Sequence, residues 1–428
     1  MRRLVFAAAC IGLLASRLPA EDPSELVTRI KAMEDRIKAL EAEVRHLKSR
    51  PVAQEPPATA QLPAQAPPAA VTLGGAGPAA AKVLNPDISL IGDFLGAAGN
   101  SANRATPSLE MHESELGLQA IIDPYARADV FLSFGQSGVE LEEGYLTFTA
   151  LPGNFQLKAG KMRAAFGKVN TLHNHALPWT DRPLVTQNLV AGEEGISDAG
   201  LSLSRILPAP KDIFVEGTAQ IFRGETEGLF QAAKRSDLSV AGRLRGYRDI
   251  TESTNIDLGG SFARGRSPFG DGWNQLYGFD ATFRWKPLRR ANYHSFVGRS
   301  ELIWARTLVR PAQTDATAPM LTINPFGYYI SGDYQLARRW FLGGRFDRSQ
   351  RGACLPTSPE VTTTCSPLLA PSALVRDTGG SVLLTYRPSE FSQIRWQLRR
   401  TRYGESLTAN EALFQIVFSM GAHGGHPF

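Results

Sequence analysis

The sequence predicts an all-β fold: a transmembrane antiparallel β-barrel of about 16 strands, preceded by a short α-helical coiled coil and a Pro/Ala-rich linker. Three observations lead to this prediction. A short apolar leader stands at the N-terminus, a heptad pattern follows it, and from about residue 85 runs of roughly ten residues alternate apolar and polar side chains. The expected parts are a signal peptide (1–20), a coiled coil (21–50), a disordered linker (51–84) and the barrel (85–428).

The first 20 residues have the pattern of a secretory signal peptide. Arg2 and Arg3 precede an apolar stretch, and the small residue Ala20 precedes an acidic start of the mature chain. The apolar stretch is shorter than the roughly 18 residues that a membrane helix needs. We therefore expect export, and a membrane-bound mature chain would cross the membrane with strands.

Residues 26–47 carry apolar side chains at alternating spacings of four and three, as in a coiled coil. These residues are Leu26, Ile30, Met33, Ile37, Leu40, Val44 and Leu47. The flanking positions pair opposite charges, such as Arg29 with Glu34. We expect this segment to lie in the periplasm and to self-associate as a dimer or trimer; a single amphipathic helix on another surface is the alternative.

The segment 51–84 is rich in Pro, Ala, Gln and Gly and predicts an extended spacer, because it has too few apolar side chains to form a core. The formal net charge of the whole chain is +5. Removal of three arginines with the leader leaves 43 basic against 41 acidic residues. A nearly neutral, exported chain without a basic block excludes a nucleic-acid partner.

Sixteen alternating runs follow. One of them places Tyr277, Phe279 and Phe283 on one face and Asp280 and Thr282 on the other. The runs begin near Ile88, Leu109, Tyr125, Val139, Phe155, Ser197, Asp212, Asp237, Ser253, Trp273, Phe296, Asn324, Arg339, Val375, Glu390 and Asn410. A barrel of this size is too wide for its own side chains to fill, so we expect the apolar face to meet lipid and the polar face to meet water.

The connections between the runs alternate in length. Tight ones at 123–124, 152–154 and 388–390 alternate with long ones such as 167–196 and 350–374. Short turns on one rim and long loops on the other are typical of bacterial outer-membrane barrels. The C-terminal Phe428 resembles the assembly signal of such barrels.

Glu142 to Lys168 (EEGYLTFTALPGNFQLKAGKMRAAFGK) resembles the phosphate-selective porin family, in which a Leu-Pro-Gly turn and a Gly-Lys/Arg-x-x-x-x-Phe-Gly strand lead into the third external loop. Asp181 to Val185 and Gly195 to Leu201 resemble the same family's exit from that loop. The resemblance implies a porin-like barrel in the cell outer membrane that passes small solutes.

Asn170 to Trp179 (NTLHNHALPW) is similar to uncharacterised outer-membrane proteins labelled zinc-regulated TonB-dependent receptors. A transporter of that type needs about 22 strands and a plug. The barrel segment is too short to supply them, so we do not expect TonB-dependent transport.

Inward positions of the strands carry many arginines, whose forked donors suit carboxylate or phosphate solutes. By parity, the pore-lining residues include Arg243, Arg245, Arg299, Glu301, Arg345, Asp347, Arg395 and Arg399. The barrel segment has 35 basic and 33 acidic residues. Two interpretations stay open: net anion selectivity, or arginines that pair with lumen carboxylates.

The long connection 167–196 follows the fifth strand, and the resemblance to porins implies a constriction loop here that folds into the channel. Its charged and titratable residues are His173, His175, Asp181, Arg182, Glu193 and Glu194. Opposed charges there would screen solutes by size and charge. His173 and His175 are also candidate ligands for a divalent ion, with Glu193 or Glu194 as a third ligand; ordinary hydrogen bonding or packing is the alternative.

Cys354 and Cys365 are close in sequence, and in an exported chain we expect a disulfide between them. No Gly-x-Ser-x-Gly motif or Ser/His/Asp cluster is present, so we expect no enzyme and no cofactor.

The expected function is an outer-membrane channel for passive diffusion of small hydrophilic solutes. The expected partners are lipid, those solutes and further copies of the chain. The alternatives are a structural anchor that tethers the envelope through its coiled coil, and a metal-related uptake protein.

Overall fold

The computed structural model describes residues 86–101, 107–136, 138–269, 271–309, 320–352, 374–404 and 407–421, together with Lys31 and Lys38. The chain divides into two compact units, Met1–Val71 and Thr72–Phe428. In the first unit, Lys31 and Lys38 are helical and exposed. The predicted signal peptide, the rest of the coiled coil, the linker, both cysteines of the expected disulfide and Phe428 lie outside the described residues.

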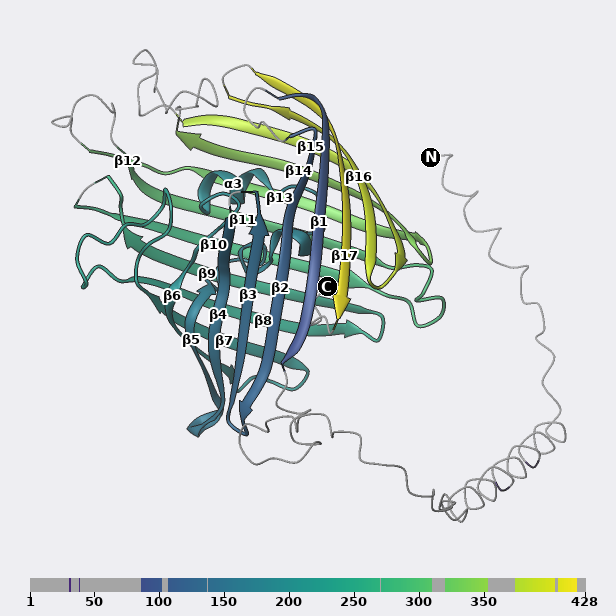
Figure 1. Cartoon of the computed structure of the whole chain (residues 1–428), viewed down its shortest axis with the longest axis horizontal. Helices are drawn as coiled ribbons and strands as arrows, with labels where there is room; N and C mark the ends of the chain where they lie inside the picture. The colour runs from purple at the N-terminus through teal and green to yellow at the C-terminus, as the bar shows by residue number, and fades with distance from the viewer. Residues whose placement is uncertain are drawn as a thin grey trace, which may run out of the picture. The chain divides into compact units, whose positions relative to one another are not determined.

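The second unit contains one antiparallel sheet that closes on itself (Figure 1). Its strands are β1 (Asp87–Asn100), β2 (Leu109–Asp123), β3 (Ala126–Gly135), β4 (Gly138–Leu151), β5 (Phe155–Arg163), β6 (Ser197–Leu207), β7 (Ile213–Phe222), β8 (Ser239–Thr251), β9 (Thr254–Arg266), β10 (Trp273–Trp285), β11 (Phe296–Val309), β12 (Leu321–Ile323), β13 (Phe326–Ala337), β14 (Trp340–Gly352), β15 (Leu374–Ser389), β16 (Ser392–Arg402) and β17 (Thr408–Gly421). Each strand pairs with its neighbours in sequence, and β1 pairs with β17 to close the ring.

The prediction of 16 strands is confirmed for the described part of the chain. Both β12 and β13 pair with β11 in succession, so they occupy one position in the wall. The other strands begin within two residues of the predicted starts, as β5 and β6 illustrate. Strands form here because residues of alternating polarity can satisfy two environments, one on each side of a single-layered wall.

The two rims of the barrel differ. The rim near Ser89 and Gly421, where β1 and β17 pair, carries short turns such as Pro152–Asn154, in which Gly153 has a φ of 75°. The opposite rim carries the long connections. We call these rims the turn end and the loop end.

The outer face of the wall is apolar. On β13, Ile330 and Leu336 are 57% and 47% exposed, whereas the inward Ser331 is 4% exposed. This arrangement confirms the predicted alternation of faces, and it suits contact with lipid on the outside.

The inner face is not polar throughout, which corrects the expectation that it meets only water. Inward positions contribute Leu276, Ile303, Tyr329 and Leu383 to a buried apolar cluster. These residues are buried because residues 164–196 fold into the lumen and pack against them. No helix among the described residues is long and apolar enough to cross a membrane.

Candidate functional site

The connection between β5 and β6 folds into the barrel and crosses its lumen; we call residues 164–196 the inner loop. It contains η2 (Val169–Thr171), η3 (Asn174–Ala176) and α3 (Leu184–Leu189), and Figure 1 shows α3 beside β13. Hydrogen bonds and ion pairs join it to β2, β4, β7, β9, β10, β11, β14, β15 and β16. The inner loop is therefore fixed to the wall around most of the barrel.

The loop enters the lumen through a tight bend at Gly167. Its φ is +57°, and the backbone amide of Val169 donates to the buried Glu301 carboxylate of β11 at 2.9 Å. A Cβ at Gly167 would lie 2.7 Å from the same carboxylate, so only glycine fits this close approach. Beyond the bend, the Lys168 ammonium donates to the Thr282 hydroxyl at 3.1 Å.

Trp179 anchors the middle of the loop. Its ring packs edge-on against Tyr329 with 5.0 Å between centroids, and the Arg345 guanidinium lies 5.0 Å from the ring centroid. The next charged residue, Asp181, accepts hydrogen bonds from Arg345 of β14 and from Arg399 of β16. This part of the loop is thereby bound to the wall by ion pairs as well as by apolar contact.

Three other predicted constriction residues have different surroundings. Arg182 is buried and donates to the Asn174 side chain and to two backbone carbonyls of its own loop. Burial, with Arg163 nearby, lowers the pKa of the Arg182 guanidinium to about 10. Glu193 lies 3.9 Å from His112, and the Glu194 carbonyl accepts a hydrogen bond from Arg163 at 2.7 Å.

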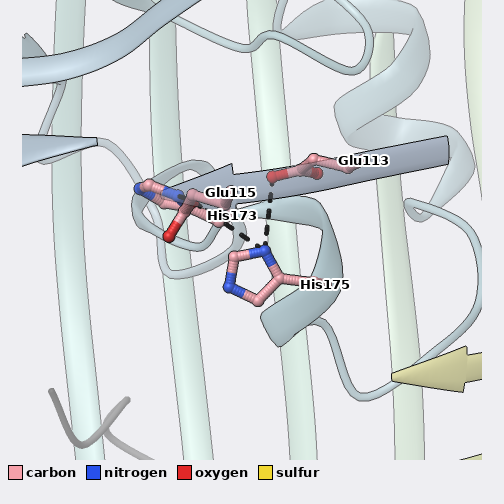
Figure 2. Close-up of side chains that lie close together, drawn as sticks. All are labelled: Glu113, Glu115, His173 and His175. Carbon is pink, nitrogen blue, oxygen red and sulfur yellow. Dashed lines mark hydrogen bonds and ion pairs between the residues drawn. The ribbon is translucent and has the colours of Figure 1, made fainter. Parts of the chain in front are cut away.

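The two histidines of the loop meet glutamates of the wall (Figure 2). Glu113 and Glu115 of β2 point toward His173 and His175, and the donor atoms of all four side chains lie within 4.8 Å of one another. We call these four residues the His/Glu cluster. All four are buried. The carboxylates of this cluster thus come from β2, and not from Glu193 or Glu194 as the sequence suggested.

Two more glutamates contact His173. Its Nε2 lies 3.0 Å from Glu143, and its Nδ1 lies 3.2 Å from Glu142 and closer still to Glu115. Glu142 in turn forms an ion pair with Arg163 at 3.1 Å. Consecutive residues of a regular strand face opposite sides, so this convergence needs an irregularity in β4.

A β-bulge supplies that irregularity. Phe131 of β3 pairs with Glu143, whereas the next residue of β3 pairs with Leu141, so Glu142 is an extra residue in β4. A second bulge leaves His112 as an extra residue in β2, directly before Glu113. Bulges redirect side chains and are frequent beside functional sites. Here they bring several titratable side chains to one patch of the lumen.

The glutamates determine the protonation of the histidines. Burial opposes the charged form of His173, but hydrogen bonds to Glu115 and Glu143 raise its pKa to about 10. For His175, Glu113 and Glu115 likewise raise the pKa against the effect of burial. With no metal cation present, the His173 ring is positively charged at neutral pH, and the glutamates favour the charged form of His175 as well.

The predicted pore-lining arginines all contact other lumen groups. Arg243 pairs with Asp280 at 2.7 Å, Arg245 with Asp257 at 2.9 Å and Arg345 with Asp347 at 2.7 Å. Arg299 pairs with Asp333 and Arg399 with Glu411, and Arg395 donates to the Gln415 amide oxygen. The structure therefore pairs most of these arginines with carboxylates, and net anion selectivity stays a prediction.

Cavities lie on both sides of the inner loop. A cavity of about 270 Å³ toward the turn end is lined by Lys168, Arg299, Arg387 and Arg395 among others. A cavity of about 220 Å³ toward the loop end is lined by Glu113, Glu140, Glu142, Glu193, Glu194 and His112 among others. The lumen is thus basic on one side of the loop and acidic on the other.

Sequence reasoning missed several residues of this site. Glu113 and Glu115 carry a signal that was available, because two acidic residues two positions apart share one face of a strand. Glu142 and Glu143 carry no such signal, because a regular strand would separate them. Trp179 is placed by packing that the sequence does not show.

No protein-family model matches the chain. An uncharacterised protein of Aquifex aeolicus is 28% identical over 404 residues, and the match covers 81% of each chain.

Solved barrels share the fold. A loop-deletion mutant of OmpT from Vibrio cholerae has a TM-score of 0.51 and 9% identity, and the match covers 79% of this chain and 100% of that one. An anion-selective porin from Comamonas acidovorans has a TM-score of 0.51 and 9% identity, with coverage of 78% and 100%. OprB from Pseudomonas putida has a TM-score of 0.51 and 10% identity, with coverage of 80% and 95%.

At these identities the likeness concerns the fold. The described barrel shares its fold with these solved outer-membrane proteins, and the predicted resemblance to porins stays a prediction beyond the fold. The narrower resemblance to phosphate-selective porins stays a prediction.

Proposed function

We propose that this protein is an outer-membrane channel through which small hydrophilic solutes diffuse passively. The observation that carries the proposal is the inner loop, which crosses the lumen of a closed 16-strand barrel with a cavity on either side. An apolar outer face suits contact with lipid, and charged side chains line both cavities, as a channel for hydrophilic solutes requires. The loop then acts as the constriction that limits solute size.

Charge supports discrimination between solutes. The acidic patch of the constriction lies along β2 and β4, whereas Lys168, Arg299, Arg387 and Arg395 line the cavity at the turn end. Charges of opposite sign on the two sides of the inner loop create a field that selects polar solutes by charge. Anionic solutes would be held by the basic cavity at the turn end after they pass the acidic one.

Single-channel recording in planar bilayers tests the proposal. We expect stable conductance steps from the refolded full-length protein, and a variant with residues 170–194 replaced by a short Gly/Ser linker should give larger steps. The reversal potential in a salt gradient then gives the sign of the selectivity. Folded, inserted protein that never conducts, with or without the inner loop, contradicts the channel.

A membrane anchor is the second candidate, and the many contacts that fix the inner loop across the lumen favour it. In this case the wild-type barrel stays closed and only the variant with the shortened loop conducts. The anchor would tether the envelope through residues 26–47, by self-association as a dimer or trimer. Chemical cross-linking of the full chain, compared with an Ile37→Asp variant, tests that self-association.

A further inference from the structure

We propose that the His/Glu cluster, formed by Glu113, Glu115, His173 and His175, binds one divalent transition-metal cation of the zinc class. This inference goes beyond the channel function, because binding of an ion at this point does not require that the barrel conducts. It would attach the inner loop to β2 through coordinate bonds.

The donor set and its spacing fit such an ion. Two imidazoles and two carboxylates are common ligands of four-coordinate zinc, with bonds of about 2.0–2.2 Å, so that neighbouring donors lie roughly 3.4 Å apart. Nδ1 of His175 lies 3.3 Å from the Glu113 carboxylate and 3.9 Å from the Glu115 carboxylate. The donor atoms of all four side chains lie within 4.8 Å of one another, which is close to the spacing around a single ion.

Glu143 prepares His173 as a ligand. Its carboxylate lies 3.0 Å from Nε2 of His173 and accepts the proton of that nitrogen. A metal-bound histidine commonly donates its other N–H to a carboxylate, which fixes the tautomer and makes the ring a better ligand. In that tautomer the Nδ1 lone pair faces the Glu115 carboxylate. Two acceptors that face each other need either a proton or a metal cation between them, and the site can therefore exchange one for the other.

The charge of the surroundings leads to the same conclusion. Glu113, Glu115 and Glu142 are buried, Glu143 beside them is half-buried, and the Arg163 guanidinium contacts Glu142 at 3.1 Å. Four carboxylates and one guanidinium leave three negative charges when both histidines are neutral. Buried charge without compensation is costly. A divalent cation compensates two of these charges, as would protons on both histidines.

The site also has a route of entry for a cation. The acidic cavity at the loop end reaches Glu113 and is lined by four further glutamates. A cleft lined by one sign of charge raises the local concentration of ions of the opposite sign. Because imidazole ligands favour zinc and its neighbours in the first transition series over calcium and magnesium, we expect selectivity for the former.

Isothermal titration calorimetry with zinc chloride tests the site in the refolded full-length protein after treatment with a chelator. We expect one zinc ion per chain. The double variant His173→Gln/His175→Gln should lose this binding, and Glu143→Gln should weaken it about 10- to 100-fold. Heat-modifiable mobility on electrophoresis verifies that each variant is folded.

Two control variants make the test specific. His294→Gln removes a histidine of the turn between β10 and β11, and His423→Gln/His426→Gln removes the pair near the C-terminus; both should keep one zinc per chain. X-ray absorption of the zinc-loaded wild type should show two imidazole ligands, a result that does not depend on any variant. If folded wild type binds no zinc, or if the His173→Gln/His175→Gln variant binds it equally well, the cluster is a protonated ion-pair network and the proposal fails. Conductance is not part of this test, so its outcome is separate from that of the channel proposal.

Discussion

The Asp181 carboxylate accepts hydrogen bonds from Nη2 of Arg345 at 2.9 and 3.0 Å, and its backbone carbonyl accepts a third from Nη1 at 2.8 Å. Arg345 is 4% exposed and lies on β14. This pair fixes one part of the inner loop to the wall, and the His/Glu cluster fixes another part to β2. The inner loop is thus attached to the wall at two separate places.

Asp181→Asn should release this attachment. Breaking a buried ion pair costs about 3–5 kcal/mol, and we expect roughly 3 kcal/mol because Arg345 and Arg399 each keep a second carboxylate partner. Thermal unfolding of the refolded barrel measures the loss, and open-channel noise should increase. Asp271→Asn, which changes an exposed aspartate, is the matched control. It should change neither the unfolding temperature nor the open-channel noise. Equal behaviour of the two variants would show that Asp181 does not hold the loop.

Gly167→Ala should destabilise the bend of the inner loop more than Gly192→Ala does. Both glycines have positive φ, +57° and +67°, so each substitution costs about 1–2 kcal/mol in backbone strain. A Cβ at Gly167 also meets the Glu301 carboxylate, whereas a Cβ at Gly192 meets nothing within 4 Å. The difference between the two unfolding temperatures isolates the contact with Glu301. If the two variants unfold at the same temperature, Gly167 does not lie as close to the Glu301 carboxylate as described.

Raising the pH from 7 to 9 should shift the ion selectivity of the proposed channel toward cations. Burial and the neighbouring Arg284 lower the pKa of the Lys168 ammonium to about 8, against the opposing effect of Asp257. Lys168 therefore loses its proton in this interval, and the lumen loses one positive charge. Reversal potentials at the two pH values measure the change, which should be smaller in Lys168→Met. A change of the same size in that variant would assign it to other groups.

The lowered pKa of Lys168 also makes the stability of the protein depend on pH. Between about pH 8 and 10.5 the unfolded chain keeps the Lys168 proton that the folded chain has lost. The free energy of unfolding rises with pH wherever the unfolded state binds more protons than the folded state. Lys168 therefore makes the protein more stable as the pH rises through this interval. Below about pH 8 it adds little to the pH dependence of stability.

Ile330→Arg should destabilise the barrel in lipid vesicles far more than Leu336→Arg. Both residues belong to β13 and are exposed on its outer face, Ile330 near the middle of the strand and Leu336 near the turn end. Arginine on the lipid face costs about 2–4 kcal/mol at the bilayer midplane and about 0–1 kcal/mol near the interface. Equilibrium unfolding by denaturant in vesicles measures both values. Equal costs would contradict the proposed position of the barrel in the membrane.

The sequence by itself determined the wall of this barrel. Alternation of apolar and polar residues is a local property with a period of two. The run 273–285 therefore predicted a strand, its length and its two faces without knowledge of the fold. For the same reason, parity placed Arg345, Asp347 and Glu301 on the inner face. The prediction that the long connection 167–196 enters the lumen came from its position after the fifth strand, by resemblance to porins.

Only the tertiary structure decided which side chains meet there. His173 lies 58 residues from Glu115 in sequence, and Asp181 lies 164 residues from Arg345, so no local pattern connects them. The bulges at His112 and Glu142 change the parity of β2 and β4, and they depend on pairing with the neighbouring strands. The contacts of the inner loop depend on closure of the barrel, because closure places strands from distant parts of the sequence around this one loop.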